Sequence, residues 1–95
     1  MTDHARSQCF AVGCDAAKPA WALMCPRHWR LVPSRIQGDV YGAHAAWKKD
    51  ESLLVPYMIA RGQAQAAVAR AEGKSRDLLD AIDAEIAGYE ARDGR

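Results

Sequence analysis

The stretch "CFAVGC" (residues 9–14) separates two cysteines by four residues, and "CPRH" (residues 25–28) follows with a cysteine and a histidine three positions apart. The complete pattern is Cys9-x4-Cys14-x10-Cys25-x2-His28. Thiolate and imidazole groups are the ligands that structural zinc sites use, in tetrahedral sets of four. The spacing therefore predicts that one structural Zn2+ is bound by Cys9, Cys14, Cys25 and His28.

Each half of this pattern has a local reason to form. Gly13 can adopt a backbone conformation that other residues resist, which suits a tight turn in the first half. Pro26 suits the first position of a helix, so Cys25 and His28 should lie on one face of a short helix. The N-terminal dipole of that helix favours the thiolate form of Cys25. A knuckle followed by such a helix is the treble-clef arrangement, and it predicts a zinc-binding lobe over residues 9–32.

Other interpretations of the cysteines are weaker. Three is an odd number, so a complete disulfide framework is excluded in a monomer, although a Cys9–Cys14 disulfide could form under oxidising conditions. A nucleophilic Cys25 with His28 as base lacks an orienting third group and a glycine-rich oxyanion segment. Four protein ligands would also leave no open position for a substrate, so we expect no enzymatic activity. His4 is a rival for the fourth ligand position.

The rest of the chain is predicted to be mainly α-helical, as a body over residues 33–92 within a single domain of residues 1–95. About three helices are expected, at 33–48, 56–72 and 76–92. Their apolar faces would be Ile36, Val40, His44 or Ala43 and Trp47; then Tyr57, Ala60, Ala64, Ala67 or Val68 and Ala71; then Leu78, Leu79, Ile82, Ile86 and Tyr89.

The residues between these helices also predict where the chain turns. Gly73 terminates a helix and Ser75 starts one, so the last two helices should form an antiparallel αα-hairpin. In the N-terminal lobe, residues 20–24 are predicted to form a short strand, paired with residues 10–12 as a hairpin.

Gly38 and Gly42 each weaken the second helix by about 1 kcal/mol against alanine. Either another backbone packs closely against them or the helix tolerates them.

Composition limits the class of protein. The 95 residues are 49% hydrophobic and 26% charged, as in a folded globular chain. Residues 1–50 carry seven Lys and Arg against four Asp and Glu, and residues 51–95 carry six against eight, so the net charge is +3 and −2, respectively. This asymmetry is too mild for a bulk nucleic-acid binder. No membrane span and no signal peptide are visible, so we expect a cytoplasmic location in a bacterial host cell.

One block of the sequence resembles a known group. Its residues are Leu23, Met24, Cys25, His28, Trp29, Val32 and Pro33, in the order LMC-x-x-HW-x-x-VP. The chain resembles, over residues 9 to about 72, small bacteriophage- and prophage-encoded Cys3His proteins, which are mostly without assigned function. Tyr41 and His44 stand where that group usually has Trp-x-x-Tyr, so the match is looser there. The resemblance implies a phage or mobile-element origin and a zinc site.

Two functions follow as hypotheses. The first is a non-enzymatic, zinc-stabilised accessory protein that binds a host or phage protein, such as an anti-CRISPR-type inhibitor of a defence complex. Its acidic last helix could meet a basic partner, and its apolar face could also pack on a second copy of the chain. The alternative is a nucleic-acid-binding zinc finger, with Trp21 or Trp29 for stacking. Its basic residues would be Lys18, Arg27, Arg30 and Arg35.

Overall fold

The computed structural model of the chain describes residues 7–18 and 22–93. It is mainly helical, with two short strands. The elements are β1 (Ser7–Gln8), β2 (Ala17–Lys18), α1 (Pro26–Trp29), α2 (Ser34–Lys49), the 3-10 turn η2 (Glu51–Leu53), α3 (Leu54–Ala71) and α4 (Arg76–Asp93). The three long helices match the predicted ones to within two residues at each end.

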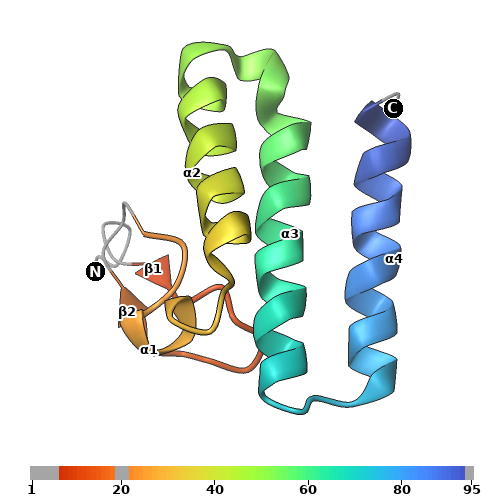
Figure 1. The fold of residues 1–95 in the computed structure, drawn as a ribbon. Helices are drawn as coiled ribbons and strands as arrows, with labels where there is room; N and C mark the ends of the chain where they lie inside the picture. The colour runs from red at the N-terminus through yellow and green to blue at the C-terminus, as the bar shows by residue number, and fades with distance from the viewer. Residues whose placement is uncertain (1–6, 19–21, 94–95) are drawn as a thin grey trace.

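The three long helices stand side by side, and the N-terminal lobe lies against the lower end of α2 and α3 (Figure 1). Helix α3 is central and packs against both α2 and α4. The predicted antiparallel αα-hairpin of α3 and α4 is confirmed. The apolar face of α4 packs on α3 of the same chain: Ile82 is buried with Ala66 and Ala69 of that helix.

The predicted hairpin is wrong in its position. The strands are antiparallel and pair Ser7 with Lys18 and Gln8 with Ala17, so they flank the first cysteine pair. Leu23 and Met24 form a bend, and residues 20–21 lie outside the described part of the chain. Among the described residues, the backbone hydrogen bond from Phe10 N–H to the Leu23 carbonyl at 3.1 Å joins the segments that were expected to pair. The backbone after Phe10 then turns, which brings the two cysteines together.

The turn between α3 and α4 forms as its residues predict. Gly73 has a φ of +69°, in the left-handed region that favours glycine. Lys74 N–H donates to the Ala69 carbonyl, and Gly73 N–H donates to the Arg70 carbonyl, which is a Schellman motif. Ser75 Oγ then accepts a hydrogen bond from Leu78 N–H and caps the start of α4.

Helix α3 begins two residues earlier than predicted. Pro56 is its third residue, where the missing N–H would have no partner within the helix in any case. Before it, Asp50 caps the turn η2 and accepts hydrogen bonds from the Ser52 backbone N–H and hydroxyl, at 3.0 and 2.7 Å. The polar break between α2 and α3 is therefore an ordered turn.

The main core joins the N-terminal lobe to the helices. Its buried residues from the lobe and the segment before α2 are Cys9, Ala11, Met24, Cys25 and Val32, and those from the helices are Ile36, Val40, Ala60, Ala64 and Val68. Ala71, expected in this seam, is exposed. A second, smaller cluster lies between α3 and α4, and Val12 from the lobe packs against it. The lobe therefore packs against the core between α2 and α3 and also against the cluster between α3 and α4.

Candidate metal centre

The structure brings the four predicted ligands together. One ligand atom from each of Cys9, Cys14, Cys25 and His28 lies within 4.8 Å of every other. Metal–ligand bonds of about 2.0–2.3 Å in a tetrahedron would place pairs of ligand atoms roughly 3.5–3.8 Å apart. The three thiols form no disulfide with one another. This arrangement is compatible with one metal ion.

The first two ligands come from a tight loop between β1 and β2. Cys9 N–H donates to the Ala16 carbonyl at 3.0 Å, which closes the base of the loop. Cys14 N–H donates to the Ala11 carbonyl at 3.2 Å, and Gly13 between them has a φ of +82°. The prediction that Gly13 supplies an unusual backbone conformation is confirmed. Cys14 Sγ also accepts a weak hydrogen bond from Ala16 N–H at 3.5 Å.

The other two ligands come from the start of α1. Cys25 is the N-cap residue and Pro26 is the first helical residue, as expected. His28 is buried, with 2% of its surface exposed. Its Nδ1 lies 3.3 Å from Cys25 Sγ and 3.5 Å from Cys9 Sγ. These distances identify Nδ1 as the atom that faces the thiols.

The opposite ring nitrogen of His28 has a partner that sequence reasoning missed. His28 Nε2 lies 2.9 Å from Oε2 of Glu72, the residue that ends α3. Arg27 Nη1 lies 4.0 Å from the same oxygen. If Nδ1 bound a metal, Nε2 would carry the ring proton and donate a hydrogen bond to the carboxylate. Such a hydrogen bond orients metal-bound histidines in many proteins. One signal was present: a carboxylate is unfavourable at a helix C-terminus, so Glu72 needs a cationic or donor partner.

Local interactions act in opposite directions on the buried thiols. Burial opposes ionisation of Cys25, but hydrogen bonds with His28 and with the other two cysteines outweigh it and lower the Cys25 pKa to about 7. At Cys9, burial dominates and raises the pKa. Of the two buried thiols, Cys25 is therefore the one that more readily offers a thiolate to a cation near neutral pH.

The remaining candidate residues are dispersed. Arg27 pairs with Glu72, and Arg35 Nη1 lies 3.8 Å from Asp39 Oδ2, so two of the proposed nucleic-acid contacts already face carboxylates. Arg30 is exposed at the end of α1. His44 packs beside the Trp47 and Tyr57 rings rather than in the cysteine cluster. His4 and Trp21 lie outside the described residues.

Comparison with protein-family models, with curated proteins and with solved structures finds no match to this chain. None of the helices in residues 7–18 and 22–93 has the length and the apolar character that crossing a bilayer requires. The site must therefore be interpreted from its own chemistry.

Proposed function

We propose that the cluster binds one Zn2+ and that this ion has a structural role in a treble-clef-like lobe. The observation that carries this proposal is the convergence of three thiols and one imidazole from a loop and a helix N-terminus. Soft thiolate ligands favour zinc over magnesium or calcium. The four residues would fill the four positions of a tetrahedral zinc ion and leave none open for a substrate. We therefore propose a binding protein rather than an enzyme.

Native mass spectrometry of the purified chain tests the metal. We expect one zinc per chain, lost in Cys14→Ala and in His28→Ala. His44→Ala is the matched control, because His44 lies outside the cluster and should leave the zinc content unchanged. A wild-type chain that is fully folded and metal-free would overturn the proposal.

We infer that the helical body binds a basic segment of another protein. The supporting feature is a groove of about 730 Å3 between α2, α3 and the end of α4. Gly38 and Gly42 line it on α2, and a Cβ on either would meet no described atom within 4 Å. Three carboxylates, those of Asp39, Glu90 and Asp93, also line the groove, and that of Asp39 lies 3.8 Å from Arg35 on the same helix.

These features suit a helix with basic residues. Two glycines four positions apart let a second helix backbone approach closely, and the carboxylates would pair with its lysines or arginines. Within the described chain nothing makes that close approach, so the glycines have no structural compensation inside the fold. The hypothesis of a phage or prophage accessory protein that blocks a host or defence complex is consistent with such a surface.

Affinity capture from bacterial lysate, followed by binding assays with each purified partner, tests this function. A partner that uses the groove should bind the wild type and lose at least tenfold in affinity with Gly42→Leu. Gly88→Leu is the matched control, because Gly88 is exposed on α4 with no described atom near its Cβ position. If every captured partner binds both variants equally, the groove is not the interface.

A further inference from the structure

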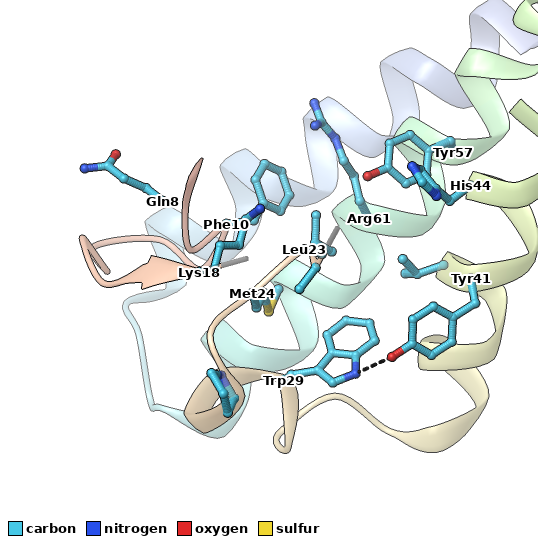
Figure 2. Close-up of a pocket in the computed structure, with 13 residues that line it drawn as sticks. Gln8, Phe10, Lys18, Leu23, Met24, Trp29, Tyr41, His44, Tyr57 and Arg61 are labelled. Atoms are coloured by element: carbon cyan, nitrogen blue, oxygen red, sulfur yellow. Dashed lines mark hydrogen bonds between the residues drawn. The ribbon is translucent and has the colours of Figure 1, made fainter. Parts of the chain in front are cut away.

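A second cavity lies on the other side of the α2–α3 pair, where the N-terminal lobe meets the helices (Figure 2). Its volume is about 600 Å3, in the range of ligand sites in proteins. Both parts of the molecule line it. The lobe and α1 contribute Gln8, Phe10, Lys18, Ala22, Leu23, Met24, Pro26 and Trp29, and the helices contribute Val40, Tyr41, His44, Tyr57 and Arg61. We call this cavity the lobe–helix cleft.

The charge of the lobe–helix cleft is uniform. Lys18 and Arg61 line it, and no Asp or Glu is among its described lining residues. This is the reverse of the acidic groove between α2, α3 and α4. Among the described residues, no carboxylate lies within ion-pair distance of Arg61. The lining therefore favours an anionic ligand.

Arg61 is held in place by rings rather than by an acid. Its guanidinium carbon lies 4.6 Å from the centroid of Phe10 and 5.8 Å from that of Tyr57. Tyr57 is fixed in turn by stacking on Trp47, with centroids 5.3 Å apart and an interplanar angle of 9°. Cation–π contacts position the charge without neutralising it. Arg61 is thus pre-organised to bind a phosphate.

The opposite wall carries a second aromatic pair. Trp29 Nε1 donates a hydrogen bond of 3.0 Å to Tyr41 Oη, and the two rings meet edge to face with centroids 5.5 Å apart (Figure 2). Tyr41 is 57% exposed, although it is a large aromatic residue. Its contact with Trp29 fixes an exposed ring at the rim of the cleft, where a planar group could stack on it.

We propose that the lobe–helix cleft binds single-stranded nucleic acid, with a base on the Trp29–Tyr41 wall and a backbone phosphate at Arg61. Aromatic platforms beside cations are how proteins bind single strands with little sequence preference. The exposed rim at Tyr41 lets the strand continue out of the cleft. This surface is separate from the groove proposed for a protein partner. It does rest on the proposed metal-bound lobe, which with α1 supplies eight of the thirteen lining residues.

Fluorescence anisotropy of the zinc-loaded full chain with short labelled oligothymidylate and oligoadenylate tests the proposal. We expect binding that weakens as salt rises, with a slope near −0.7 for each phosphate neutralised. Arg61→Gln should reduce affinity about tenfold and flatten the salt slope, and Tyr41→Ala should reduce affinity by about tenfold or more. Arg35→Gln and Tyr89→Ala are the matched controls, because neither residue lines the cleft, and both should bind as the wild type does.

Zinc content and thermal unfolding are measured on each variant in parallel, so that a lost lobe is distinguished from a lost contact. No binding of either oligonucleotide at low salt by the folded, zinc-loaded wild type would overturn the proposal. Equal binding by the wild type, Arg61→Gln and Tyr41→Ala would also overturn it. A fluorescently labelled mononucleotide is measured directly in the same assay. Binding of mononucleotides without any binding of oligonucleotides would show that the cleft takes a free nucleotide, and the proposal of a strand would be wrong.

Discussion

His28 connects two parts of the molecule that are distant in sequence. Its Nδ1 faces the thiols of Cys9 and Cys25, and its Nε2 bonds to Glu72, 44 residues further along the chain. The carboxylate stabilises the tautomer that leaves the Nδ1 lone pair available for a metal. Ligand geometry in the lobe is therefore coupled to the end of α3.

Substituting Glu72 should weaken metal binding without removing a ligand. We expect Glu72→Ala to lower the affinity for zinc by about 10- to 100-fold, the usual effect of removing such a carboxylate. Glu72→Gln keeps an acceptor for the Nε2 proton and should fall between alanine and wild type. Competition with a chromophoric chelator measures these affinities.

The matched control for this series is Glu85→Ala, because Glu85 is an exposed carboxylate on α4 that bonds to none of the ligands. It should bind zinc as the wild type does. Equal affinities for Glu72→Ala and wild type would show that the Glu72 contact does not orient His28.

The grouping of Cys9, Cys14, Cys25 and His28 could be predicted from sequence because their spacing is itself the signal. Two lie around a glycine turn and two around a proline at a helix start, so local rules place each pair. The contacts of Glu72 with His28 and of Arg61 with Phe10 could not be predicted, because they depend on how α3 packs against the lobe. The hairpin was misplaced for a related reason: the backbone between Cys9 and Cys14 turns instead of extending as a strand.

At the scale of the element, α3 differs from its sequence prediction by burying two faces. Ala60, Ala64 and Val68 face the main core, as predicted, but Ala66 and Ala69 also form a cluster with α4. Small residues on every side of the helix weaken the apolar periodicity of its sequence. The face that packs on α4 could therefore not be predicted from that periodicity. A central helix with neighbours on both sides needs such residues, because bulkier ones would hold its neighbours apart.

Gly62 on α3 lies against Ile86 of α4, so an added methyl group should destabilise the fold at Gly62 and stabilise it at Gly38. A Cβ at Gly62 would lie 2.9 Å from Ile86 Cγ1, whereas a Cβ at Gly38 would meet no described atom within 4 Å. Gly38→Ala should stabilise the fold by about 0.5–1 kcal/mol through helix propensity. Gly62→Ala gains the same propensity but must displace Ile86, which costs about 1–3 kcal/mol.

Urea unfolding of the two glycine variants measures the difference. We expect Gly62→Ala to be less stable than Gly38→Ala, by an amount equal to the packing cost alone. The comparison cancels the propensity term, because both positions lie inside helices. Equal changes in the free energy of unfolding would mean that α4 does not pack on α3 at Gly62 in solution.

At the scale of the whole molecule, the lobe and the helices share one core while α3 and α4 share another. Cys9 and Cys25 lie in the same buried cluster as Val40 and Ala64. Gln65 Nε2 on α3 also donates a hydrogen bond of 2.9 Å to the Phe10 carbonyl. An ion that holds the lobe together would therefore stabilise the α2–α3 contact too, whereas the buried cluster between α3 and α4 meets the lobe at Val12, a partly buried residue at its edge.

Removing the metal should consequently loosen the molecule unevenly. A metal ion that binds only the folded state raises the free energy of unfolding, by an amount that grows with the logarithm of its concentration over Kd. A chelator removes the free ion and therefore removes this stabilisation. We expect chelation to accelerate amide hydrogen exchange over residues 9–32 and at the start of α2, where Ile36 and Val40 face the lobe. The second half of α3 and the facing part of α4 should stay protected, because Ala66, Ala69 and Ile82 form their own buried cluster. Uniform acceleration along all three long helices would show that the chain unfolds as a single unit, whereas unchanged exchange in the lobe would show that the cysteine cluster needs no metal to fold.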